Sequence, residues 1–318
     1  MRIRRVTDPY RALVFALLCA ACGTDTRGIH IATLPGTISS LVAGENKIYT
    51  RGYNEIYEIE PTGRSRALVT TPTESTVLAV ASAELFFPLS VVTANGAIGA
   101  YDVSSGAQRT VVPPRSITAV VTELLADVDH VFWVEHALPG ETTVHVVNAD
   151  GTAPAVLANG FRILQDDHAV YWTSGDDIVR AEKANLSSRT SLATGPHGVT
   201  AVDRGKIYWS AGPAPTLLSM PADGSVIAPA VAAVLPTSSA GSDVTAIQFL
   251  AGTLYVEVME HEHGDCPGTC FYTARVLEID PGRQVEIARA DHVSATPPFV
   301  AGAGGVFWAF STSLYRIR

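Results

Sequence analysis

The segment richest in side chains that could do chemistry is 260–270, with the sequence EHEHGDCPGTC. Imidazole, carboxylate and thiolate groups are the donors that zinc and copper prefer. One hypothesis is therefore a metal site with His261 and His263 as ligands, joined by the two cysteines if they are reduced. The segment lacks a His-Glu-x-x-His sequence and the two-residue cysteine spacing of zinc ribbons. The favoured interpretation is an acidic, solvated loop without metal or other cofactor.

The two cysteines of this segment have a second interpretation. Cys266 and Cys270 are separated by Pro-Gly-Thr, a turn sequence that can bring two thiols together. In an exported protein such a pair predicts a local disulfide. Because the closed loop is very short, the bond is expected to stiffen the segment and to add little global stability.

Export is indicated by the first 21 residues. MRIRRVTDPYR is basic, and ALVFALLCAAC is an apolar run of eleven residues. At 1.5 Å per residue this run spans about half of a ~30 Å hydrocarbon core. We therefore expect residues 1–21 to be a signal peptide rather than a membrane anchor. No later segment of the sequence approaches membrane-spanning length.

The end of this run, Cys19-Ala20-Ala21-Cys22-Gly23, resembles the lipobox of bacterial lipoproteins. In that family a peptidase cuts before the cysteine, which carries diacylglycerol. The resemblance implies lipidation of Cys22, a tether over 22–28, and a place in the bacterial cell envelope, either the periplasm or the outer membrane and cell surface. The membrane contact would then be the lipid alone. Cys19 stands where the family usually has Leu, and the alternative is an ordinary secretory signal that leaves a soluble protein.

Composition excludes several classes of protein. Of the 318 residues, 47% are hydrophobic and 17% are charged, which fits a packed globule rather than a disordered chain. The formal net charge is −9, and the leader is basic, so the remainder is more acidic still. Such a chain has no electrostatic footprint for nucleic acid or anionic lipid.

A unit of four short strands repeats along the chain. Its most visible part is an apolar-aromatic anchor such as Val170-Tyr171-Trp172, preceded by an apolar strand and a turn of Gly, Asp or Asn, and followed by two more strands. Successive anchors lie about 37 to 52 residues apart, a spacing typical of propeller blades. The anchors are 48–49, 85–86, 131–133, 170–172, 207–209, 254–255 and 306–308.

Four antiparallel strands per repeat, without helical periodicity, predict an all-β, single-domain β-propeller over 29–318. Seven anchors predict seven blades, and six is the alternative if the weak repeat at 79–101 is misread. The last repeat ends before its fourth strand, and an orphan strand at 29–34 precedes the first repeat. We expect this N-terminal strand to complete the last blade, because closure removes exposed sheet edges.

Two repeats resemble the YWTD propeller repeats of lipoprotein receptors, through 170–173 with 178–180 and 207–210 with 223–224. The Asp of that motif is replaced by Ser174 and Ala211. The whole mature chain also resembles the exported TolB-like propellers of bacterial lipoproteins. These resemblances imply fold and compartment, but propellers carry many unrelated functions.

Beyond segment 260–270, the repeat pattern leaves few candidates for chemistry. The sequence has no Gly-x-Ser-x-Gly and no Walker motif, and the glycines of 302–305 occupy a hairpin-turn position. The innermost strands are mostly apolar or small. Their polar exceptions are Glu123, Arg162 and Gln165.

Further polar residues are predicted on the surface. His130 and His168 are expected to be exposed turn residues, and the repeated tyrosines and tryptophans are expected to be core. Asp176-Asp177 and Glu135-His136 are expected in the loops between second and third strands. These loops, with the 260–270 segment, would form an acidic binding face.

The working hypothesis is a monomeric, envelope-tethered lipoprotein with a non-catalytic binding or scaffolding role. Its ligand would be an unknown protein or small molecule on the face that carries these loops. The alternative is an exported propeller enzyme, either a metal-dependent hydrolase, a lactonase or a lyase. That alternative requires carboxylate or imidazole groups to converge in the central channel.

Overall fold

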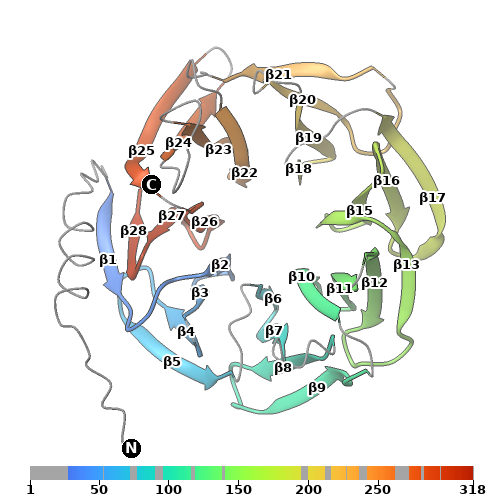
Figure 1. Cartoon of the computed structure of the whole chain (residues 1–318), viewed down its shortest axis with the longest axis horizontal. Helices are drawn as coiled ribbons and strands as arrows, with labels where there is room; N and C mark the ends of the chain where they lie inside the picture. Colours follow the sequence, from blue (N-terminus) through green and yellow to red (C-terminus); the bar gives the residue numbers. More distant parts are fainter. Residues whose placement is uncertain are drawn as a thin grey trace, which may run out of the picture.

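The computed structural model describes residues 28–52, 54–71, 77–89, 96–115, 119–137, 140–194, 200–211, 216–226, 228–235, 242–261, 272–280, 283–293 and 295–317. All regular structure within these ranges is β-strand, arranged as seven four-stranded antiparallel sheets in a ring (Figure 1). The chain is therefore a seven-bladed β-propeller, as predicted. The weak repeat at 79–101 lies in a complete blade, so the six-bladed alternative is wrong.

Blades 1 to 4 follow one another along the chain. Blade 1 contains β2 (Ser40–Ala43), β3 (Ile48–Arg51), β4 (Glu55–Ile59) and β5 (Ser65–Thr70). Blade 2 contains β6 (Ala79–Ala81), β7 (Glu84–Pro88), β8 (Ile98–Asp102) and β9 (Gln108–Val112). Blade 3 contains β10 (Ala119–Ala126), β11 (His130–Ala137), β12 (Thr142–Asn148) and β13 (Ala155–Asn159). Blade 4 contains β14 (Phe161–Gln165), β15 (Ala169–Ser174), β16 (Asp177–Glu182) and β17 (Asn185–Thr194).

Blades 5 to 7 complete the ring. Blade 5 contains β18 (Thr200–Asp203), β19 (Lys206–Ala211), β20 (Thr216–Pro221) and β21 (Ala230–Val234). Blade 6 contains β22 (Ser242–Leu250), β23 (Thr253–His261), β24 (Tyr272–Asp280) and β25 (Arg283–Val293). Blade 7 contains β26 (Phe299–Gly302), β27 (Gly305–Phe310), β28 (Ser313–Arg316) and β1 (Ile29–Thr33).

The N-terminal strand closes the ring, as predicted. β1 pairs antiparallel with β28, with Ile29 opposite Arg316 and Thr33 opposite Ser313. Two backbone hydrogen bonds extend this contact, from Leu34 N to Thr312 O and from Ile38 N to Ser311 O, both 2.8 Å. The two ends of the described chain are thereby joined in one sheet, β1 lying beside β28 in Figure 1.

The alternation of side chains along the second strand of each blade explains the aromatic anchors. Successive residues of a strand point to opposite faces of the sheet, and in a propeller both faces pack on a neighbouring blade. In β15, Tyr171 packs with blade 5 residues and Trp172 with blade 3 residues. Trp308 of β27 likewise packs on blade 6, and Phe307 packs on blade 1. Most of the tyrosines and tryptophans of the anchors are buried, as predicted.

The ring has two different ends, named here by the connections they carry. The loop face carries the connections between second and third strands and between successive blades, such as 311–312 and 34–39. The turn face carries the hairpin turns between first and second strands and between third and fourth strands, such as 44–47 and 103–107. In the described part of the chain, no helix is long and apolar enough to cross a membrane.

Candidate functional site

The loop face of blade 6 contains the one predicted metal candidate that the structure describes. His261 ends β23, and its Nε2 lies 3.2 Å from Oδ2 of Asp243 at the start of the inner strand β22. Its ring meets the ring of Tyr272, the first residue of β24, edge-on at 5.1 Å. His261 and Tyr272 form the last rung of the β23–β24 hairpin, from which the segment 262–271 departs.

On the side that faces β25, this hairpin is stabilised by ion pairs. The buried Glu260 pairs with Arg275, whose Nη2 is 2.8 Å from the carboxylate, and Arg275 also reaches Glu286 at 3.4 Å. β23 and β24 have nine residues each, the longest second and third strands of the seven described blades. The loop-face half of the β23–β24 hairpin is therefore tied to both neighbouring strands, to β22 through His261–Asp243 and to β25 through Arg275–Glu286.

The remaining predicted site residues fall outside the described residues. These are Cys22, His263, Cys266 and Cys270, together with the leader 1–21 and the tether up to residue 27. Lipidation, the disulfide and the metal hypothesis at His263 thus stay predictions. Among the described residues, no group of three or more His, Cys, Asp or Glu side chains is arranged to hold a metal ion.

The polar exceptions of the inner strands join blade 3 to blade 4. Glu123 accepts hydrogen bonds from the backbone N–H groups of Arg162 and Ile163, both at 2.8 Å. Burial raises the pKa of Glu123, and these two hydrogen bonds oppose that rise. Gln165 Nε2 donates to the carbonyl of Ala126 at 2.7 Å. These three contacts explain Glu123 and Gln165 as structural links between inner strands.

The prediction for Glu135 and His136 is wrong. Both lie inside β11 rather than in a loop, and Glu135 is buried. The Glu135 carboxylate forms an ion pair with Arg115 and accepts a hydrogen bond from Trp133 Nε1 at 3.3 Å. The prediction failed because β11 continues further than its apolar run, and an ion pair satisfies the acidic side chain inside the interface.

His145, which was not among the residues predicted from the sequence, belongs to the same buried cluster between blades 2 and 3. Its ring stacks on Trp133 with centroids 4.9 Å apart, and its Nε2 lies 2.7 Å from Thr143 Oγ1. Burial, with the charge of Arg115, lowers the pKa of His145 to about 4. The imidazole is therefore neutral under ordinary conditions, and the cluster serves as an inter-blade polar contact.

A second buried carboxylate, also missed from the sequence, lies between blades 6 and 7. Glu257 is 1% exposed and accepts hydrogen bonds from Trp308 Nε1 at 2.9 Å and from Thr245 Oγ1 at 2.8 Å. Burial raises its pKa to about 7. In blade 1, Arg51 has the same strand position and donates from Nη2 to Thr71 Oγ1 at 2.9 Å. An ionisable residue within an apolar strand run, as in YVEVM, is the sequence signal for such a site.

The smaller surface predictions have mixed outcomes. His168 is exposed, as expected, and Asp176 lies in an exposed turn. The side chain of His130 is only 20% exposed, since this residue begins β11, packs against Phe132 and lies near Asp127, so its prediction is wrong. Asp177 lies in β16 rather than in a loop, so its prediction is wrong, and it accepts a hydrogen bond from Thr194 Oγ1 at 2.6 Å.

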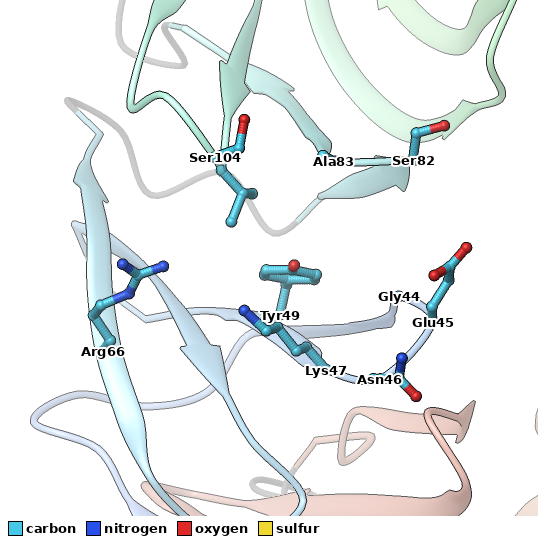
Figure 2. A pocket seen from close by; sticks show the side chains of 10 residues that line it. Gly44, Glu45, Asn46, Lys47, Tyr49, Arg66, Ser82, Ala83 and Ser104 are labelled. Carbon is cyan, nitrogen blue, oxygen red and sulfur yellow. The ribbon is translucent and has the colours of Figure 1, made fainter.

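The turn face has a groove between blades 1 and 2, with a volume of about 310 Å³ (Figure 2). Lys47 and Arg66 border it and converge on the buried Glu58, with Lys47 Nζ 2.8 Å and Arg66 Nη2 3.2 Å from its carboxylate oxygens. Tyr49 also lines the groove and is paired across the strands with Glu58. Burial, and secondarily the charge of Glu58, raises the pKa of Tyr49. The remaining lining residues are Gly44, Glu45, Asn46, Ser82, Ala83, Val103 and Ser104.

Comparison with known proteins supports the fold and no particular function. No protein-family model and no curated protein matches the chain. Among solved structures, the chain is similar to the computationally designed Ika8 protein, with a TM-score of 0.55, 13% identity, and coverage of 91% of this chain and 99% of that one.

Two natural enzymes are also similar in structure. A gluconolactonase from Xanthomonas campestris has a TM-score of 0.48, 15% identity, and coverage of 76% of this chain and 89% of that chain. An oligogalacturonate lyase in complex with manganese has a TM-score of 0.49, 11% identity, and coverage of 78% and 74%. At these identities no activity is carried over from them.

Proposed function

We propose that this seven-bladed propeller is a lipid-anchored binding module of the bacterial cell envelope, which recognises a protein or small-molecule partner through the loop face of blade 6. The observation that carries the proposal is the pinned β23–β24 hairpin. It is the longest such hairpin in the described chain, and its last rung, His261–Tyr272, is the base of the acidic segment 262–271. Specificity on a rigid scaffold usually lies in loops of this kind.

A binding role is favoured over catalysis because polar side chains of the inner strands form hydrogen bonds between blades. Glu123 and Gln165, two polar side chains of the inner strands, are committed to hydrogen bonds with the next or preceding inner strand. The buried carboxylates Glu135 and Glu257 are likewise held in inter-blade contacts. The fold thus uses these groups to join blades.

The binding role is tested by photo-crosslinking in a bacterial host. A photoreactive residue at position 263 is expected to give a discrete crosslinked product, whereas one at the exposed His168 on the turn face gives none. Replacement of 262–271 by Asn-Gly should abolish binding of that partner with little change in the melting temperature. Equal crosslinking from both positions, or unchanged binding after the replacement, would refute the proposal.

The anchor is tested separately. With an alkyne-bearing fatty acid in the medium, the full chain is expected to become labelled and to sediment with membranes. Cys22→Ala should lose both properties, and Cys19→Ala should retain them. If Cys22→Ala keeps the label, the lipidation site is elsewhere.

The metal alternative is tested by mass spectrometry of the mature domain purified without chelator. A metal-free protein is expected, because the described residues contain no group of three or more His, Cys, Asp or Glu side chains arranged to hold a metal ion. One equivalent of metal that is lost in His261→Ala/His263→Ala would favour the enzyme alternative.

A further inference from the structure

Among the described residues, the groove between blades 1 and 2 lacks the charged side chain that crosses to the next blade at two other interfaces. Between blades 3 and 4, Lys183 crosses to Asp127, with Nζ 2.6 Å from the carboxylate. Between blades 5 and 6, the guanidinium of Arg204 lies over Gly252. Between blades 1 and 2, Val103 stands at the position of Lys183, Gly44 at that of Asp127 and Glu45 at that of Arg204, and in the described part of the chain no ion pair joins these turns across the groove.

Two cationic side chains of this groove, Lys47 and Arg66, are held in position by Glu58. Tyr49, Glu58 and Arg66 lie side by side on β3, β4 and β5, because Tyr49 pairs with Glu58 and Glu58 pairs with Arg66. Glu58 is buried and holds both Lys47 and Arg66, which are 40% and 59% exposed. An ammonium and a guanidinium each have several N–H donors, so donors remain for a ligand beyond those used on Glu58.

The charge around the groove is uneven. Lys47 and Arg66 lie on one side, and Glu45 lies on the opposite side (Figure 2). The carboxylate of the nearby Asp102 forms hydrogen bonds within its own turn. Its Oδ1 accepts hydrogen bonds from Ser104 N at 2.8 Å and from Ser104 Oγ at 2.6 Å. The cationic side therefore suits one carboxylate, whereas the rest of the lining suits hydroxyl groups.

We propose that this groove binds a monosaccharide-sized molecule with one carboxylate and several hydroxyl groups, a sugar acid of the hexuronate class. The carboxylate pairs with Lys47 and Arg66, the side chains that present free donors there. The hydroxyl groups face Asn46, Ser82 and Glu45. A volume of about 310 Å³ is at the small end for ligand pockets, which limits the ligand to about one sugar ring. This site lies on the turn face and is independent of the loop-face proposal.

The test is a calorimetric titration of the mature protein with glucuronate and with glucose, its neutral counterpart. Glucuronate is expected to bind with a dissociation constant below about 10 mM, and glucose at least about tenfold more weakly. Methyl β-glucuronide distinguishes the end of a glycan chain from the free acid. Stronger binding of the glycoside assigns the site to a chain terminus, and weaker binding assigns it to the free sugar acid.

Three variants assign the binding to the groove. Lys47→Met/Arg66→Met should weaken glucuronate at least about tenfold, because two charge-assisted contacts are lost. Lys206→Met is the matched control, since Lys206 precedes Ile207-Tyr208 as Lys47 precedes Ile48-Tyr49, and it should change affinity by less than about twofold. Ala83→Phe fills the groove without removing charge and should also abolish binding. Equal binding of glucose and glucuronate, no heat with either, or equal losses in Lys206→Met and the double variant would overturn the proposal.

Discussion

Buried charge is the main feature at the residue scale. Glu257 and Glu135 are nearly inaccessible, and each accepts a hydrogen bond from a tryptophan indole. They differ in their other partner, because Glu135 has the guanidinium of Arg115 and Glu257 has only the hydroxyl of Thr245. A carboxylate without a cation is disfavoured as an anion inside a protein, which explains the raised pKa of Glu257.

This difference predicts a pH-dependent stability. The pKa of Glu257 is about 7 in the folded state, above its unfolded value of 4.5, so the folded state favours the protonated form. Its contribution is fully present below pH 4.5 and is lost as the pH rises through 7. Glu257→Gln stays neutral, so urea unfolding should show it more stable than the parent at pH 8, by on the order of 2–3 kcal/mol, with the difference vanishing below about pH 4. Parallel pH curves for the two proteins would contradict this.

Gly96 gives a second prediction at this scale. Its φ is +64°, and a Cβ there would collide with both Arg115 and Glu135. Gly175 has a similar φ of +60° with open space around it. Gly175→Ala should cost about 1 kcal/mol for backbone strain alone, whereas Gly96→Ala should cost about 2–4 kcal/mol in urea unfolding. Equal costs would mean that the ion pair moves aside freely.

At the scale of elements, β1 decides whether the ring is closed. Ala32 of β1 and Leu34 directly after it are buried, and β1 covers the edge of β28, which would otherwise present unpaired backbone groups. The register of β1 against β28 shifts between His30 and Ala32.

Removal of β1 is therefore expected to be costly. A chain that begins at Pro35 should lose on the order of 3–5 kcal/mol of unfolding free energy and should form dimers or larger species through the β28 edge. A chain that begins at Gly28 is the control and should remain monomeric. Light scattering and urea unfolding of the two chains measure both effects. A stable monomer without β1 would show that the hydrogen bonds of β1 are dispensable.

At the scale of the whole molecule, the ring is held together by seven blade interfaces of packed side chains, each with its own buried cluster in the described residues. Closure between β1 and β28 is noncovalent. We therefore expect the stability of the ring to depend on the presence of β1 in blade 7, and not on the position of the chain termini.

This predicts tolerance of circular permutation. Gly28 lies beside Ile317, so a short Gly-rich linker can join these ends, and new termini can be placed between Gly36 and Thr37. The permuted chain should unfold in one transition within about 1 kcal/mol of the parent, because every blade remains complete. A loss as large as that of the chain without β1 would contradict the prediction and show that the loop 34–38 is needed intact.

The sequence alone determined the blades, their number and their closure. A blade is a local unit, and its pattern of apolar anchor and turn is visible within about 40 residues. The tertiary structure decided the partners of the buried groups and the position of the groove. Glu257 meets Trp308, 51 residues away, and Glu123 meets Arg162, 39 residues away. The sequence around one residue of each pair does not predict the other residue, because contacts between blades depend on side chains that only the closed ring brings together.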